Sequence, residues 1–175
     1  NTSCNHITIN SGATLTNRDG YSTTLDVNGD FTNYGSVVNT NASLYLNLYA
    51  DLYNAGTYYP YSTVFESGSK HEISQANGKY FEGRYHTEDT VASIVFTSDV
   101  EFRKALLQGY ANYSVAPYYA KIETNGHNPY FNECEILQFR IVSDDEINFD
   151  KSYLRQLMFY EDVTTKGSFS VYSNS

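Results

Sequence analysis

The segment 46–58 repeats the segment 25–37 without a gap, each residue lying 21 positions after its counterpart. Both copies alternate apolar and polar residues, turn at Asn, Gly or Asp, and then alternate again. Alternation with a period of two predicts half-buried strands, and short repeats of strand and turn are typical of stacked coils. The residues matched at this offset are Leu25 with Leu46, Val27 with Leu48, Asp30 with Asp51, Phe31 with Leu52, Asn33 with Asn54, and Gly35 with Gly56.

The repeat predicts an all-β chain folded as a right-handed parallel β-helix, a solenoid with coils of about 20 residues. Inward side chains of one coil are expected to stack on those of the next coil, about 4.8 Å away. A β-sandwich is the alternative, because it also has short strands at regular spacing. The gapless repeat favours the solenoid, since a sandwich has no reason to repeat Asp, Asn and Gly at matched offsets.

Looser copies extend the pattern along the chain, so that about eight coils form a single solenoid domain over residues 1–175. Ile122 and Ile141 lie 19 residues apart, and Phe131 and Phe149 lie 18 apart. The segment 104–119 does not fit a coil and is expected to be a loop insertion, with one helical turn at 105–108. In the copy at 7–17, Ile7, Ile9, Leu15 and Asn17 take the places of Leu25, Val27, Phe31 and Asn33, with two residues inserted.

The coil corners are predicted to carry a structural ladder of Asn17, Asn33 and Asn54. Asn tolerates left-handed backbone angles and bonds to its own backbone, so it suits a tight corner. Stacked one above another, the three side-chain amides are expected to form hydrogen bonds along the solenoid axis.

The phrases at 7–17, 25–37 and 62–74 resemble the repeats of large secreted surface proteins of Bacteroidetes, which are similar to parallel β-helix proteins. This resemblance implies adhesion or surface coating, export by the type IX secretion system, and a secreted or cell-surface location. Because the chain begins at Asn1 and no C-terminal sorting domain is recognised, we expect a processed or excised piece of a longer protein. Flanking domains or a capping partner are expected to cover the strands exposed at the solenoid ends.

Charge excludes several classes of partner. The formal net charge is −9, and charged residues make up only 18% of the chain. Nucleic-acid binding needs clustered Lys and Arg, and an anionic membrane surface repels an acidic protein, so neither partner is expected. The sequence has no run of about 18 apolar residues and therefore predicts no membrane-spanning helix.

Cys4 and Cys134 are predicted to remain unpaired. About six coils separate them, which corresponds to roughly 30 Å along a continuous solenoid. A disulfide requires Cα atoms within about 7 Å of each other. Cys134 is expected to be a buried, inert thiol.

Tyrosine is abundant, with 18 residues, and six of them cluster at 45–61. Exposed aromatic rings stack on sugar rings and bury a large area at small entropic cost. Leu44, Leu46, Leu48 and Leu52 compete for the interior, so Tyr45, Tyr49 and Tyr53 are expected to face outward as ligand-binding residues for extracellular glycans. Filling of the core by many of the tyrosines is the competing interpretation.

Metal binding and catalysis have weaker candidates. Ca²⁺ is the one cofactor considered, and its candidate ligands are Asp144, Asp145 and Glu146, which form the densest acidic cluster. The segment 26–30 resembles a calcium loop but lacks the Glu that closes such a loop. A polysaccharide lyase or hydrolase is the enzymatic alternative to a non-catalytic segment. Its candidate residues are Arg140 beside the acidic run, Arg103 beside Asp99, and the pair Glu133 and Glu135, placed on one strand face about 7 Å apart.

Thr90 lies in Asp89-Thr90-Val91, which resembles the Asp-Thr-aliphatic O-glycosylation site of Bacteroidetes proteins. It is the glycosylation candidate. Taken together, these features predict a non-catalytic segment of a secreted cell-surface protein, serving adhesion, display or glycan contact.

Overall fold

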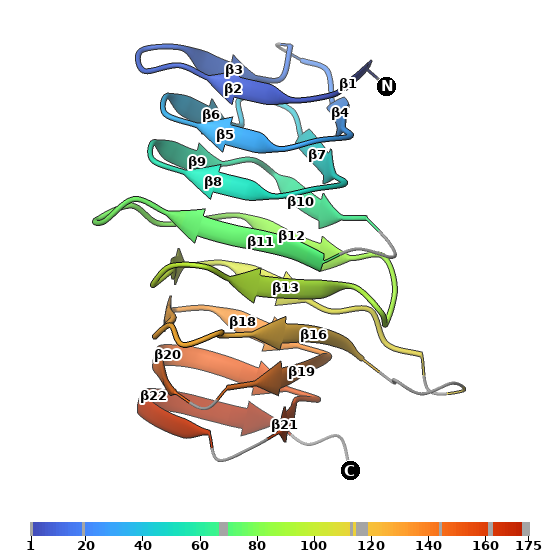
Figure 1. The fold of residues 1–175 in the computed structure, drawn as a ribbon. Helices are drawn as coiled ribbons and strands as arrows, with labels where there is room; N and C mark the ends of the chain where they lie inside the picture. The colour runs from blue at the N-terminus through green and yellow to red at the C-terminus, as the bar shows by residue number, and fades with distance from the viewer. Residues whose placement is uncertain are drawn as a thin grey trace.

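The chain winds into a right-handed parallel β-solenoid of about eight turns, each of about 21 residues (Figure 1). The computed structural model describes residues 2–18, 20–66, 70–112, 114, 119–143, 145–160 and 163–172. Within these ranges the regular structure consists of strands, without a helix. The predicted solenoid is therefore confirmed, and the sandwich alternative is wrong because neighbouring strands of the sheets pair in parallel.

Three strips of parallel strands run along the solenoid axis and form its three faces. The first face contains β1 (Thr2–Cys4), β4 (Thr23–Val27), β7 (Leu44–Leu48), β10 (Ser62–Phe65), β12 (Arg84–Thr87), β15 (Leu106–Gln108), β18 (Glu135–Leu137) and part of β20 (Glu146–Arg155). The second face contains β2 (Ile7–Ile9), β5 (Phe31–Asn33), β8 (Leu52–Asn54), β11 (Lys70–Gln75), β13 (Ser93–Phe96), β16 (Ala120–Glu123), β19 (Phe139–Val142) and β21 (Met158–Tyr160).

The third face begins with β3 (Thr14–Thr16), β6 (Ser36–Val38) and β9 (Thr57–Tyr59) and ends with β14 (Glu101–Arg103), β17 (Tyr130–Asn132) and the start of β20. Single-residue parallel bridges from Tyr58 to Phe81 and from Phe81 to Phe102 join its two halves. The final strand, β22 (Thr164–Tyr172), pairs along β20 and so continues two faces at once.

The register predicted from the repeat is confirmed where the repeat is strongest. Leu25 pairs with Leu46 between β4 and β7, and Asn33 pairs with Asn54 between β5 and β8. The looser spacings also hold, since β16 pairs with β19 and β17 with β20 at the predicted offsets.

The alignment of the first coil is wrong. Ile7 pairs with Phe31, and Ile9 pairs with Asn33, so the segment 7–9 lies on the second face and not on the first. Strands on every face alternate apolar and polar residues, so alternation alone does not tell one face from the next. Asn17 therefore lies at a different corner from Asn33.

The segment 104–119 is only partly an insertion. Leu106–Gln108 is the strand β15, which pairs with both β12 and β18, so the predicted helical turn is wrong. Leu107 points into the core, as alternation in a strand requires. Beyond it, Ala111 pairs with Tyr119 in an antiparallel bridge, and residues 113 and 115–118 between them lie outside the described residues.

An aromatic column runs through the core along the axis. Its successive ring centroids lie 6.0, 5.5, 5.3, 5.5, 5.5 and 5.4 Å apart. Aromatic pairs at this spacing add about 0.5–1.5 kcal/mol each to the stability gained from burying their area. The column consists of the buried residues Phe31, Tyr58, Phe81, Phe102, Phe131 and Phe149, and it ends at Phe169, which is exposed on the last coil.

Tyr58 shows that part of the tyrosine cluster fills the core. Its ring is buried, and its hydroxyl lies 2.9 Å from the Thr63 hydroxyl. Burial raises the pKa of Tyr58 because the phenolate would lose its solvation. The core interpretation thus holds for this member of the cluster.

A repeated Asn-x-Gly unit makes one corner of the second and third coils. The Asn33 Nδ2 donates to Asn54 Oδ1 at 2.9 Å, and each Asn Oδ1 accepts the backbone N–H of the Gly two residues later, at 3.1 Å. A Cβ added to Gly56 would lie 2.0 Å from the Gly35 carbonyl oxygen, so the coils approach too closely for any other residue. The predicted ladder therefore exists between Asn33 and Asn54.

Asn17 is not part of that ladder. Its Oδ1 accepts hydrogen bonds from the backbone and hydroxyl of Thr40, at 3.0 and 3.1 Å, and its Nδ2 donates to the Tyr21 carbonyl at 3.4 Å. Asn17 stabilises the corner after β3, because its side chain supplies hydrogen-bond partners to backbone groups that have none within a strand.

The two cysteines are free, as predicted. Cys134 is buried, and its thiol lies 3.3 Å from the Phe102 carbonyl oxygen. Burial raises the pKa of Cys134 to about 12, so the reactive thiolate is suppressed.

Candidate functional site

The three tyrosines predicted to contact glycans face outward, yet they do not form one surface. Tyr45 lies on β7 of the first face, Tyr53 lies on β8 of the second face, and Tyr49 lies at the corner between them. Sequence neighbours within one coil diverge around the solenoid, whereas residues one coil apart stack. Accordingly, the Tyr45 ring packs 5.3 Å from Tyr61, and the Tyr53 ring packs 5.8 Å from Tyr34.

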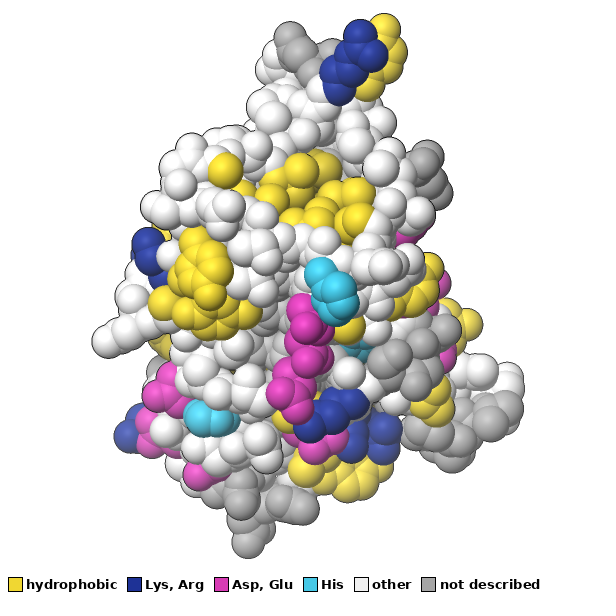
Figure 2. All heavy atoms as spheres, turned by 45° about the horizontal axis from the view of Figure 1, so that its top comes forward, with side chains coloured by type: hydrophobic (Ala, Val, Ile, Leu, Met, Phe, Trp, Pro, Cys, Tyr) yellow, Lys and Arg dark blue, Asp and Glu magenta, His cyan; other side chains and the backbone are white. Residues whose placement is uncertain are grey.

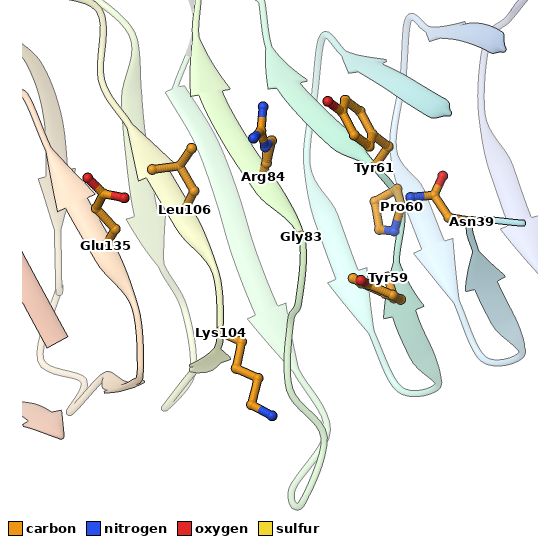
Figure 3. Close-up of a pocket in the computed structure, with 9 residues that line it drawn as sticks. All are labelled: Asn39, Tyr59, Pro60, Tyr61, Gly83, Arg84, Lys104, Leu106 and Glu135. Atoms are coloured by element: carbon orange, nitrogen blue, oxygen red, sulfur yellow. The ribbon is translucent and has the colours of Figure 1, made fainter. Parts of the chain in front are cut away.

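A groove of about 320 Å³ follows the corner where the third face meets the first (Figure 3). We call it the Tyr59–Tyr61 groove. Residues from successive coil corners and from the first face line it, so it crosses the coils and does not follow a single one. The lining residues are Asn39, Tyr59, Pro60, Tyr61, Gly83, Arg84, Lys104, Leu106 and Glu135.

The backbone of the Tyr59–Tyr61 groove is held by a close contact between two coils. Gly83 has φ of +104°, and a Cβ placed on it would lie 2.5 Å from the Pro60 carbonyl oxygen. Pro60 itself is buried, which sends the two flanking tyrosine rings to the surface. Tyr59 is 48% exposed and Tyr61 is 37% exposed, so part of each side chain is available to a ligand, while the Tyr61 ring also contacts Tyr45 and Arg84.

Two cations line the Tyr59–Tyr61 groove. The Arg84 guanidinium carbon lies 5.3 Å from the centre of the Tyr61 ring, a cation–π distance. Neither Arg84 nor Lys104 forms an ion pair with any carboxylate that the structure describes. Glu135 is the acidic lining residue, and it lies two strands from Arg84, with Leu106 between them.

The charge of Arg84 also reaches His86, two residues along β12 on the same face. Burial of the His86 ring lowers its pKa, the positive charge of Arg84 lowers it further, and Glu88 opposes these effects. The imidazole of His86 therefore reports on the electrostatic potential beside the groove.

A second groove, of about 210 Å³, lies on the second face and is lined by stacked carboxylates. Asp30, Asp51 and Glu72 belong to successive coils, and the Asp51 carboxylate accepts the backbone N–H of Glu72 at 2.8 Å. Figure 2 shows an acidic column on this face, below a histidine. Tyr53 lines this acidic groove, so it is separated from the Tyr59–Tyr61 groove.

Two members of the acidic run proposed for Ca²⁺, Asp145 and Glu146, lie within the described residues. Asp144 lies outside them. Glu146 forms an ion pair with Lys166, and the backbone N–H of Asp145 donates to the Ser143 hydroxyl at 3.2 Å. Among the residues described, no group of three or more His, Cys, Asp or Glu side chains is arranged to hold a metal ion.

Thr90 is half-buried in the turn between β12 and β13. The Asp89 carboxylate shapes this turn by accepting the backbone N–H groups of Val91 and Ala92, at 3.0 and 2.7 Å. Thr90 thus lies in a surface turn, the usual setting of a modified side chain.

The arginines considered for catalysis have other partners. Arg103 forms an ion pair with Glu101 and packs 4.1 Å from the centre of the Tyr80 ring. The Arg140 Nε donates to the Tyr119 carbonyl at 2.9 Å. Both guanidinium groups are therefore engaged in holding the coils together.

The expected pairing of Glu133 and Glu135 on one strand face is wrong. Glu133 has φ of +54° at a corner between β17 and β18, and its carboxylate lies 3.9 Å from the Lys151 amine. Glu135 begins the next strand and lines the Tyr59–Tyr61 groove. A corner separates the two residues, so strand geometry does not relate their carboxylates.

Sequence reasoning missed Gly83, Arg84 and Lys104. They come from a stretch without a visible repeat, and Arg84 meets the tyrosines only because it pairs with Ser62, 22 residues earlier. That spacing is close to the repeat of 21, so extending the repeat would have predicted that Arg84 lies one coil after the tyrosines.

Comparison with known proteins yields no relative: no family model, no curated protein and no solved structure matches this chain. The described residues also contain no helix long and apolar enough to cross a bilayer.

Proposed function

We propose that this chain is a non-catalytic segment of a secreted cell-surface protein that contacts glycans through the Tyr59–Tyr61 groove. The observation that carries the proposal is the pair of exposed tyrosine rings, Tyr59 and Tyr61, held by a rigid corner beside hydrogen-bonding side chains. Aromatic faces with adjacent polar groups are the side chains that sugar rings require, because a sugar has apolar faces and a polar rim.

The solenoid supports an adhesive role. Side chains one coil apart lie about 4.8 Å apart along the axis, so the surface presents a regular row of contacts to a long ligand. Rigid strands also hold these side chains at a small entropic cost on binding.

The ends of the solenoid support the proposal that flanking domains or a capping partner belong to the assembly. Apolar side chains gather near the last coil, where strands lack a further neighbour in the described structure. Exposed edges of this kind promote pairing with another chain unless they are covered. The exposed residues are Met158, Phe159, Tyr160, Phe169 and Val171.

Secretion and the likeness to Bacteroidetes surface repeats belong to the same proposal. Support comes from the Asn-, Ser- and Thr-rich sequence and the turn that presents Thr90. O-linked glycan at Thr90, identified by mass spectrometry of protein purified from its native source, is the expected modification.

A glycan array with the purified chain tests the proposal. Tyr61→Ala and Tyr59→Ala should each weaken binding about tenfold or more, because each removes one stacking surface. Tyr21→Ala is the matched control, since Tyr21 is 65% exposed and lies outside the groove. Absence of binding to every glycan, or equal binding by both groove variants and the control, would reject the proposal.

Three further variants and one assay separate the alternatives. Loss of binding in Tyr53→Ala alone would move the site to the acidic groove, and loss in Tyr49→Ala alone would move it to the corner between the first and second faces. Because Tyr45 packs against Tyr61, loss in Tyr45→Ala would move the site to the first face only where Tyr61→Ala binds like the unmodified chain. Shortening of the bound polysaccharide during incubation would make the chain a lyase or hydrolase.

A further inference from the structure

We infer that the Tyr59–Tyr61 groove selects an extended acidic polysaccharide, whose carboxylate or sulfate groups meet Arg84 and Lys104. This inference rests on the proposed glycan contact and names its ligand class.

The charge of the groove differs in sign from the net charge of the chain. The protein carries a net charge of −9, so most of its surface repels anions. The Tyr59–Tyr61 groove has the opposite balance, with two cations and one carboxylate among its lining residues. An acidic polymer that binds this protein is therefore directed to the groove.

Both cations of the groove are available to a ligand. Five lysines and arginines form described ion pairs with an acidic neighbour on the same or the next coil, as Lys70 does with Glu72 and Lys121 does with Glu123. Arg84 and Lys104 have no such partner among the described carboxylates. Each is free to bind an oxyanion without first losing an ion pair.

The arrangement of rings and charges in the groove suits an extended ligand. Arg84 packs against the Tyr61 ring, which holds the planar guanidinium at the surface in position for a bidentate bond to a carboxylate or sulfate. Figure 3 shows Arg84 and Lys104 on opposite sides of the groove, separated along the strand direction, with the two side chains extending away from one another. One small anion does not satisfy both cations, whereas successive units of a polymer do.

Glu135 limits how far an acidic ligand extends along the groove. Glu135 lies two strands beyond Arg84 on the first face, about 9–10 Å away by strand spacing. Its carboxylate repels an acidic sugar at that end of the groove. Removing this charge should strengthen binding, which gives the inference a variant expected to gain affinity.

Titration calorimetry with four defined ligands tests the selectivity. The ligands are polygalacturonate, its fully methyl-esterified neutral form, a sulfated polysaccharide, and monomeric galacturonate. Binding of the acidic polymers should exceed binding of the neutral polymer by about tenfold or more, and should weaken as salt is raised. Comparison of the carboxylated and sulfated polymers identifies the preferred anion.

The variants assign the selectivity to the groove. Arg84→Gln and Lys104→Gln should each weaken binding of the acidic polymer about fivefold or more, with little change for the neutral polymer, and Glu135→Gln should strengthen it. Lys79→Gln is the matched control, because it removes one positive charge outside the groove. The acidic polymer should bind this control like the unmodified chain.

Each adverse result has a distinct meaning. Equal affinity for the acidic and neutral polymers overturns the inference and leaves the proposed glycan contact standing. Equal losses in Arg84→Gln and Lys79→Gln overturn the assignment to this groove, and a monomer that binds as tightly as the polymer overturns the extended ligand. Failure to bind any of the polymers, together with an empty glycan array, removes the proposed function as well.

His86 supplies a readout that does not depend on affinity. Proton NMR titration of its ring should show a higher pKa in Arg84→Gln, because one cause of the depressed pKa has been removed. A bound acidic polymer should raise the pKa of His86 in the unmodified chain by screening the same charge. An unchanged pKa of His86 at saturation with the polymer would place the ligand elsewhere.

Discussion

Asn54→Ala tests whether the ladder of corner amides holds successive coils together. The Asn54 side chain is fully buried and serves three groups. Its Oδ1 accepts from Asn33 Nδ2 at 2.9 Å and from the Gly56 N–H at 3.1 Å, and its Nδ2 donates to the Tyr80 carbonyl at 3.1 Å. One amide therefore connects three consecutive coils.

The expected loss follows from the groups left without these bonds. Asn33 Nδ2 keeps its bond to the Thr57 carbonyl at 2.8 Å, so it is only partly affected. The Gly56 N–H and the Tyr80 carbonyl each lose the bond that Asn54 made, and both are half-buried, so each loss costs about 1 kcal/mol, at the low end of the range for a buried polar group. We expect Asn54→Ala to lower the free energy of unfolding by about 2 kcal/mol.

Equilibrium urea denaturation followed by circular dichroism measures this loss. Asn47→Ala is the matched control, because its amide makes one outward bond, to Asp26 Oδ1 at 2.7 Å, and water can replace it. The control should lose about 1 kcal/mol or less. If Asn54→Ala costs no more than Asn47→Ala, the corner amides do not hold the coils and the account of the repeat is wrong.

Two further predictions concern the corners. Gly56→Ala should prevent soluble folding or lower the free energy of unfolding by more than about 3 kcal/mol, since its Cβ would lie 2.0 Å from the Gly35 carbonyl oxygen. Gly78 has open space around it, so Gly78→Ala should cost only about 1–2 kcal/mol for its positive φ. Equal losses of the two variants in urea denaturation would contradict the close approach of the coils at Gly56. The pKa of Glu66 is raised by burial and then by Glu88 and Asp26, against the smaller opposing effect of His71. A raised pKa in the folded state means that the protonated form contributes stability below the unfolded value of 4.5, and that this contribution is lost as pH rises through the folded pKa. Glu66→Gln should therefore raise the thermal midpoint at about pH 7 and flatten its decline between about pH 4.5 and 7, and a midpoint lowered at neutral pH would refute the assigned cause.

The sequence by itself determined the parallel coils of the first half of the chain. Leu25 over Leu46 and Asn33 over Asn54 follow from a gapless offset, because identical corners require identical spacing between them. Alternation likewise predicted that Tyr45 and Tyr53 point outward, since side chains on a strand alternate between its faces.

Only the tertiary structure decided which outward residues meet. Alternation states whether a side chain points in or out, but it does not assign a strand to one of three similar faces, and so it misplaced Ile7 and Asn17. Where the repeat fades, the register depends on how side chains of unlike coils fit together, as in the stacking of Phe81 on Phe102. Packing between neighbouring coils therefore brings Arg84 beside Tyr61 and creates the groove. The sequence of one coil does not determine this packing, because it depends on the side chains of the next coil.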